Sequence, residues 1–107
     1  MAAVPRRTLP QLYARWFGWG LVVAAALGFA GVLDVDAWHS ALHLVTGLIG
    51  LAAWRSAAGA RAYALVFGLG YLALGVLGEA TVPHVLIGGA GLLSALVPPG
   101  TPAPSTA

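Results

Sequence analysis

The sequence predicts an all-α fold, specifically a polytopic transmembrane four-helix bundle built from two tandem helical-hairpin repeats. The first observation is composition: 60% of the 107 residues are hydrophobic, only 7% are charged, and the mean hydropathy is +0.90. A soluble domain of this size would have to expose most of these apolar side chains to water. The second is that charged residues interrupt the apolar sequence at three places, and the third is that the second half of the chain resembles the first.

The interruptions divide the chain into four apolar segments, each at or near the roughly 17–25 residues that cross a bilayer. We expect one domain over residues 13–97, with helices at about 13–33, 38–54, 61–78 and 83–97. Pro83 suits a first helical turn, and the prolines from Pro98 onward end the fourth helix, which is the shortest. Residues 1–12 and 98–107 are predicted to form a cytoplasmic N-terminal tail and a flexible C-terminal tail.

Positive and negative charges lie in alternate gaps between these segments. All arginines lie before or at the start of the first segment, or between the second segment and the start of the third (Arg6, Arg7, Arg15, Arg55 and Arg61). All acids lie in the other two gaps (Asp34, Asp36 and Glu79). Because arginine-rich segments stay in the cytoplasm, we expect a multi-pass protein of the bacterial inner (plasma) membrane with both termini cytoplasmic. The lipid bilayer is then its first partner, and nucleic-acid binding is not expected because there is no basic run or aromatic platform.

The two halves share short sequence blocks in the same order. Residues 43–51 and 84–92 both read His-x-x-x-Gly-x-x-Gly-Leu, and residues 17–20 and 67–70 both read Phe-Gly-x-Gly. Each half would then be an arginine-led helix, an acidic turn and a helix rich in histidine and glycine. Because each unit contains two helices, both units would point the same way through the membrane.

Small residues recur along one face of several predicted helices. Such rows let helix backbones approach closely where lipid provides no hydrophobic drive for association. Most are expected to serve ordinary helix packing, and some could form a homo-oligomer face or admit a flat cofactor. The glycines assigned to helix packing are Gly20, Gly28, Gly47, Gly50, Gly68, Gly88 and Gly91.

The residues that could carry chemistry gather at the outer end of the predicted bundle: His39, His43, His84, Glu79, Asp34 and Asp36. His39 and His43 lie one turn apart on one helix face, so with His84 and an acid they could bind zinc or copper. Alternatively, His43 and His84 could ligate haem iron from both sides, with the following glycines making room for the macrocycle. A proton relay through His43, Glu79 and His84 is a third interpretation. The fourth is structural, with the histidines hydrogen-bonding to neighbours and fixing helix register.

The sequence favours a non-enzymatic role. No nucleophile, base and orienting group form an evident set, and the absence of cysteine excludes disulfides and thiolate metal sites. The leading interpretation is a structural or accessory subunit of a larger membrane complex, or a small homo-oligomer, for which no cofactor is predicted. Haem or divalent-metal binding is the alternative, and a small proton-coupled transporter is the second alternative.

Several of these motifs together resemble a known bacterial family. They are the Leu42-His43-Leu44 block, Gly47 and Gly50 after it, and the Arg61-Ala62-Tyr63-Ala64 start of the third segment. The family comprises small four-helix inner-membrane proteins with a domain of unknown function, and the resemblance covers about residues 15–96. The second block here reads Pro83-His84-Val85, without the leucine that the family pattern has before histidine. The resemblance implies a location and a fold, and it supplies no activity.

Overall fold

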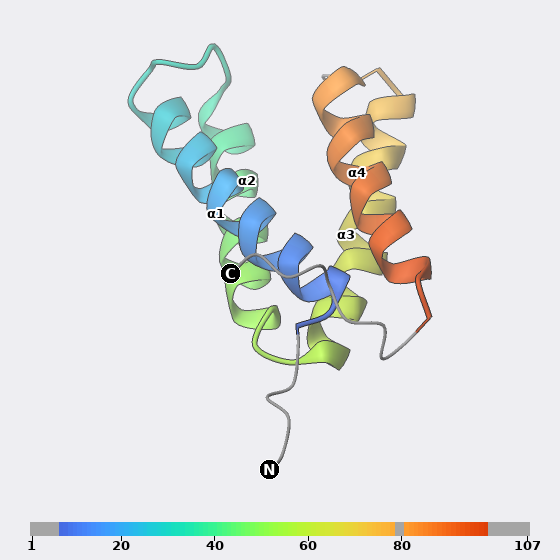
Figure 1. Ribbon diagram of the computed structural model, residues 1–107. Coiled ribbons are helices and arrows are strands. Elements are labelled where there is room, and N and C mark those ends of the chain that lie inside the picture. The colour runs from blue at the N-terminus through green and yellow to red at the C-terminus, as the bar shows by residue number, and fades with distance from the viewer. Residues whose placement is uncertain (1–6, 79–80, 99–107) are drawn as a thin grey trace.

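The computed structural model describes residues 7–78 and 81–98, which form four helices and no strand (Figure 1). In order these are α1 (Leu9–Phe29), α2 (Ala37–Ala53), α3 (Ala57–Val76) and α4 (Thr81–Leu96). The predicted all-α class is confirmed for this part of the chain. The strongest packing pairs α1 with α2 and α3 with α4 as antiparallel hairpins. The two hairpins meet at the end where α2 connects to α3 and diverge toward the opposite end (Figure 1).

Polar caps begin α1 and α3 earlier than the apolar pattern predicts. The Thr8 side chain accepts a hydrogen bond from the Gln11 backbone, and the Gln11 side chain accepts one from the Thr8 backbone. This capping box starts α1 at Leu9 rather than near residue 13, so the predicted tail over 1–12 is too long. In the same way Ser56 accepts from the Gly59 N–H and starts α3 at Ala57 rather than near residue 61.

Two glycines end the long helices before their predicted ends. Gly31 and Gly78 have φ angles of +81° and +95°, a left-handed conformation that glycine adopts without steric cost. As a result α1 ends at Phe29 instead of near residue 33, and α3 ends at Val76. The chain then turns, and Asp36 starts α2 by accepting a hydrogen bond of 2.7 Å from the His39 N–H.

Within each hairpin the helix backbones touch at glycines. A Cβ atom added to Gly18 of α1 would lie 3.0 Å from the carbonyl oxygen of Gly47 in α2. A Cβ atom added to Gly68 of α3 would lie 3.1 Å from the carbonyl oxygen of Gly88 in α4. Any side chain at these positions would push the helices apart, so glycine is what allows the close packing.

Two tyrosines join one hairpin to the other. The Tyr13 hydroxyl of α1 donates to the Ile87 carbonyl of α4, and the Tyr63 hydroxyl of α3 donates to the Thr46 carbonyl of α2, both at 3.0 Å. The centroids of the two tyrosine rings are 6.0 Å apart. The small core therefore lies where the hairpins meet, and it consists of Tyr13, Ala14, Ala60, Tyr63, Ala64 and Ala95.

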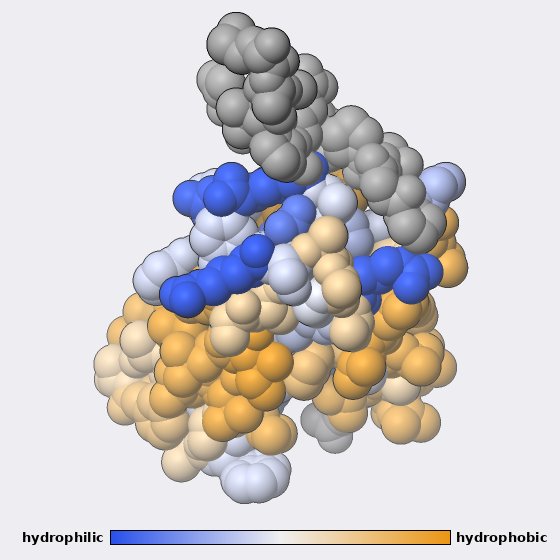
Figure 2. All heavy atoms as spheres, turned by 90° about the horizontal axis from the view of Figure 1, so that it is seen from below, coloured by the Kyte–Doolittle hydropathy of each residue, from blue (hydrophilic) through white to orange (hydrophobic). Residues whose placement is uncertain are grey.

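Large apolar side chains point outward from every helix. Trp16 of α1 is 61% exposed and Leu86 of α4 is 66% exposed, and α2 and α3 expose several more. Helices α1 and α3 are long and apolar enough to cross a membrane, whereas α2 and α4 are shorter apolar helices. Only 28% of the most apolar 18-residue stretch of α1 and 33% of that of α3 are buried, whereas the core helix of a soluble protein would be mostly buried. Seen from the α2–α3 end, hydrophilic side chains lie beside a largely hydrophobic surface (Figure 2).

We predict that Gly88→Ala destabilises the fold and that Gly89→Ala does not. A Cβ atom at Gly88 would collide with the Leu72 backbone nitrogen and lie 2.5 Å from the Gly68 carbonyl oxygen, and neither backbone atom can rotate away. The expected loss is about 1–3 kcal/mol of unfolding free energy. A Cβ atom at the neighbouring Gly89 would meet nothing within 4 Å, so that variant is the matched control. Thermal unfolding in detergent measures both, and equal midpoints would contradict this account of the packing.

Candidate functional site

A groove of about 590 Å³ opens between α2 and the α3–α4 hairpin, at the end away from the tyrosine core. The first turns of α2 contribute His39 and His43, and the first turn of α4 contributes His84. The polar side chains that line the groove are Asp36, His39, His43, Thr46, Tyr71 and His84.

The three histidines converge on one point. One ring nitrogen from each of His39, His43 and His84 lies within 4.8 Å of the others. The Nε2 atoms of His39 and His43 are 3.0 Å apart, and their rings meet edge to face at a centroid distance of 4.4 Å. The His84 ring lies nearly parallel to that of His39, with the centroids 5.9 Å apart. Imidazoles from both hairpins are thus gathered at one site.

The wall below the histidines is neutral and hydrogen-bonded. Tyr71 of α3 packs its ring 5.3 Å from that of His84, and its hydroxyl lies 2.8 Å from Thr46 Oγ1. The Thr46 hydroxyl also lies 2.8 Å from the Leu42 carbonyl of its own helix and has one proton to donate. Because the carbonyl can only accept, we assign that proton to Leu42, and Tyr71 then donates to Thr46. His84 is 5% exposed, whereas His39 and His43 are partly exposed along the groove.

One buried polar atom of the site has no hydrogen-bond partner. It is Nδ1 of His43, and neither residues 7–78 nor residues 81–98 provide a partner for it. A buried donor or acceptor without a partner costs about 1–3 kcal/mol. The His43 ring is therefore positioned by packing and by its contact with His39, and not by a hydrogen bond at Nδ1.

The spacing of the imidazoles suits one small cation. Zinc bound tetrahedrally at about 2.0–2.1 Å from nitrogen separates neighbouring ligand atoms by roughly 3.3 Å. The Nε2 atoms of His39 and His43 are near that separation, and all three ligand atoms lie within 4.8 Å, so modest side-chain rotation would close the set. Three imidazoles would leave a fourth coordination position directed toward the groove.

The acids that the sequence places beside the histidines have different surroundings. Asp36 lines the groove, and its carboxylate caps α2 by accepting from the His39 N–H. Asp34 is exposed in the turn between α1 and α2. Glu79 lies outside the described residues. Of the two described acids, Asp36 is therefore the one placed to act as a fourth metal ligand, although its carboxylate already caps α2.

The glycines assigned to helix packing also divide. Those of α2, α3 and α4 (Gly47, Gly50, Gly68, Gly88 and Gly91) all lie at close contacts with another helix. Gly50 and Gly91 face the Tyr63 and Tyr13 rings, respectively, and Gly28 faces Ser40. Gly20 is different, because it is exposed and meets no other helix of this chain. Its predicted packing role is not fulfilled within one chain, because its face of α1 points outward.

The sequence did not single out Tyr71 as a residue of the groove, and it did not predict that Tyr13 and Tyr63 join the hairpins. A signal for the last pair was present, since both halves read Tyr-x-x-x-Phe-Gly at the start of their first helix. The buried Ser40, whose hydroxyl has no partner among the described residues, was also overlooked.

Comparison with known proteins gives a family and no activity. The family described as a domain of unknown function, DUF4383, matches residues 25–85, which run from α1 into α4 and include all three histidines. No curated protein and no solved structure matches the chain. Because the match covers more than half of the sequence, the chain belongs to the DUF4383 family.

Proposed function

We propose that this chain is a four-pass integral membrane protein with both ends in the cytoplasm and the histidine groove at the outer face. The apolar side chains exposed on all four helices support this placement, because lipid can cover them and water cannot. The described arginines lie at the end where the hairpins meet, and the described acids lie at the other end, as the positive-inside rule requires. The bacterial inner membrane, predicted above, is the corresponding location.

The proposal includes equivalence of the two hairpins as structural repeats. Tyr13 donates to a carbonyl of α4, and its counterpart Tyr63 donates to the matching carbonyl of α2. The glycine contacts repeat in the same way, with the Gly18–Gly47 contact of the first hairpin answered by a contact of the same kind in the second. Reciprocal contacts of this kind are what two repeats related by an axis along the membrane normal would make.

The short helices explain how the groove reaches water. Helices α2 and α4 have 17 and 16 residues, so at about 1.5 Å per residue each is shorter than the roughly 30 Å hydrocarbon core. If their cytoplasmic ends lie at the inner interface, their first turns lie below the outer interface. His39, His43 and His84 all lie within the first two turns of these helices. The histidines would therefore sit in a shallow depression that is open to the outside.

Within this placement we propose that the protein binds one first-row transition-metal ion, zinc or copper, through His39, His43 and His84. The observation that carries this proposal is the convergence of their ring nitrogens within 4.8 Å. Imidazole is a preferred ligand of both metals. Haem would need two axial nitrogens on opposite sides of a flat macrocycle, and these three rings meet at one point. A proton path would need titratable groups across the bundle, but the described acids and histidines are confined to one end.

We predict that the chelator-treated protein takes up one Zn²⁺ or Cu²⁺ per chain in mild detergent. His84→Ala and His43→Ala should each weaken binding by at least about a hundredfold, because even loss of an outer-shell partner costs up to that much. Asp34→Asn is the matched control, since it changes a group at the same end outside the histidine cluster. Calorimetry and elemental analysis measure the affinity and the stoichiometry.

The same preparation distinguishes the alternatives. Equal affinities of the wild type and His84→Ala would overturn the metal site, provided that circular dichroism shows the variant folded. A Soret band in the protein as isolated would indicate haem instead. A wild type that binds neither ion, and is colourless and metal-free, would leave the histidines as structural groups.

The topology predicts opposite labelling of two introduced cysteines. The chain contains no cysteine, so single substitutions at exposed positions report without background. Val32→Cys lies in the α1–α2 turn and should react with a membrane-impermeant maleimide on intact cells. Ala57→Cys lies at the start of α3 and should react only after the membrane is permeabilised. The reverse pattern would overturn the orientation, and labelling of both from one side would overturn the four-pass arrangement.

A second candidate role, a small homo-oligomer or a subunit of a larger membrane complex, is favoured by the outer face of α1. Gly20 and Ala24 are one turn apart there, and Gly20 meets no other helix of the chain. Such a small-residue row lets a helix of another chain approach closely. This face is therefore the proposed contact with a second copy.

Gly20→Leu is expected to convert the protein to a monomer, because the added side chain would hold the second helix away. Ala73→Leu, at an exposed position of α3, is the control and should leave the oligomer intact. Light scattering coupled to size exclusion measures the state. A wild type that is monomeric, or a Gly20→Leu variant that stays oligomeric, would contradict this role, and a co-purifying chain of other sequence would point to the larger complex.

A further inference from the structure

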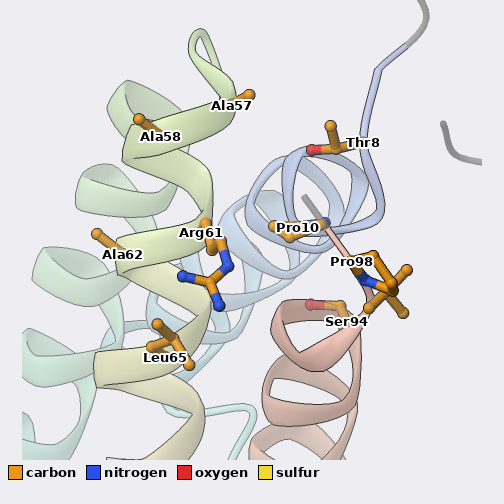
Figure 3. A pocket seen from close by; sticks show the side chains of 10 residues that line it. Thr8, Pro10, Ala57, Ala58, Arg61, Ala62, Leu65, Ser94 and Pro98 are labelled. Carbon is orange, nitrogen blue, oxygen red and sulfur yellow. The ribbon is translucent and has the colours of Figure 1, made fainter. Parts of the chain in front are cut away.

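We propose that a second site, at the cytoplasmic end, binds an anionic phospholipid with its phosphate on Arg61. A pocket of about 440 Å³ lies there between α1, α3 and the end of α4 (Figure 3). Its lining includes Arg61, Pro10, Ala62, Leu65, Ser94 and Pro98. The proposal rests on the membrane placement given above and is independent of the metal site.

The Arg61 guanidinium is tethered so that it faces this pocket. Its Nε donates a hydrogen bond of 3.2 Å to the carbonyl of Ala95, in the last turn of α4. That bond uses one of the five N–H donors of the group, and the guanidinium lies in the space between the helices (Figure 3). No acid pairs with it in the described parts of the chain, where Asp34 and Asp36 lie at the opposite end. The terminal nitrogens can therefore donate to two oxygens of one phosphate, the geometry that arginine favours.

Two helices begin at the rim of the same pocket. Thr8 and Pro10 belong to the start of α1, and Ala57 and Ala58 form the first turn of α3. Both first turns present the positive end of a helix dipole. In α3 the N–H groups of Ala57 and Ala58 have no intrahelical partner, whereas in α1 Pro10 has no N–H and the Gln11 N–H is already bonded to Thr8. These ends add to the positive potential of the Arg61 guanidinium, which carries a full charge, whereas the C-terminal end of α4 at the same pocket carries only a partial negative charge.

The remainder of the lining favours a lipid over free phosphate. Ala62, Leu65, Val97 and Pro98 are apolar, whereas a site for a soluble anion needs several polar donors. Leu65 follows Arg61 by one helical turn, about 6 Å toward the middle of the bundle. If the headgroup of a lipid is bound at Arg61, its acyl chain would thus lie along α3 beside Leu65.

The surroundings set the depth and the charge of the ligand. Trp54 lies at this end with Arg7 and Arg15 stacked 4.4 and 5.0 Å from its ring, an arrangement typical of the membrane interface. Arg7, Arg15 and Arg61 share this end, and no described acid offsets their charge. Basic pockets between membrane helices on the cytoplasmic side suit headgroups with a net negative charge. The site therefore selects phosphatidylglycerol-like lipids over zwitterionic ones.

The test is native mass spectrometry of the full chain in mild detergent, titrated with phosphatidylglycerol or with phosphatidylcholine. Arg61→Gln should weaken binding of the first phosphatidylglycerol by about tenfold, as expected for lost hydrogen bonds to a charged group. Arg55→Gln makes the same charge change at an exposed position in the α2–α3 connection and should leave that affinity unchanged. If both variants lost the same affinity for phosphatidylglycerol, the effect would come from non-specific charge attraction, and the proposed site would be overturned.

A second pair of variants keeps the test decisive if Arg61→Gln loosens α4. Ala62→Trp fills the pocket at an exposed position without changing charge and should also abolish the retained lipid. Ala52→Trp, exposed on α2 and outside the pocket, is its control. Retention of phosphatidylglycerol by a folded Ala62→Trp variant would overturn the proposal.

Competition and purification separate the remaining outcomes. Displacement of the lipid by millimolar inorganic phosphate would show a site for soluble anions, and equal affinity for phosphatidylcholine would remove the charge selectivity; either result overturns the proposal. A protein that stays soluble without detergent would overturn the membrane placement itself. A protein that needs detergent but binds lipid equally in all variants would overturn only this site.

Discussion

Backbone-to-backbone contact at glycine is the constraint on which the rest of this structure depends. Because Gly18 and Gly47, and Gly68 and Gly88, leave no side chain between paired helices, each hairpin closes without a bulky core. The large apolar residues that a soluble bundle would place inside are then left on the outside. Close packing between the helices and exposure of apolar side chains on the outside therefore have the same origin. Both fit helices that associate through direct contact with one another and not through exclusion of water.

The hairpins are held together at one end only, and that asymmetry creates the groove. Tyr13 and Tyr63 each donate to a carbonyl of the opposite hairpin near the end where α2 connects to α3. No equally extensive core joins α2 to α4 at the other end of the described chain, where the helices diverge (Figure 1). The space between them is bridged by rings, those of His39 and His84 with Tyr71 beside them. The histidine site is thus a consequence of where the tyrosines are.

Much of this arrangement could be predicted from the sequence, and what could not has specific physical causes. Composition predicted four helices, and the His-x-x-x-His spacing placed His39 beside His43. The predicted helix boundaries differ from those observed because caps and turns set them. These act through hydrogen bonds and backbone conformation, which a hydropathy pattern does not contain (Thr8, Ser56, Gly31 and Gly78). The approach of His84 to His39 depends on the angle between hairpins, which the tyrosine bonds set. No periodicity within a single helix carries that information.

A metal ion at the histidine groove would act on the fold as well as occupy a site. His39 and His43 belong to the first hairpin and His84 to the second, so an ion bound by all three would join the hairpins at the end that the tyrosines leave unclamped. Binding would stabilise the closed arrangement by an amount that grows with the logarithm of metal concentration over Kd. At the other end, a lipid on Arg61 would contact the start of α1 and the junction of α3 with α4. Under both proposals, a bound ligand would hold together helices that the small core at the tyrosines does not join.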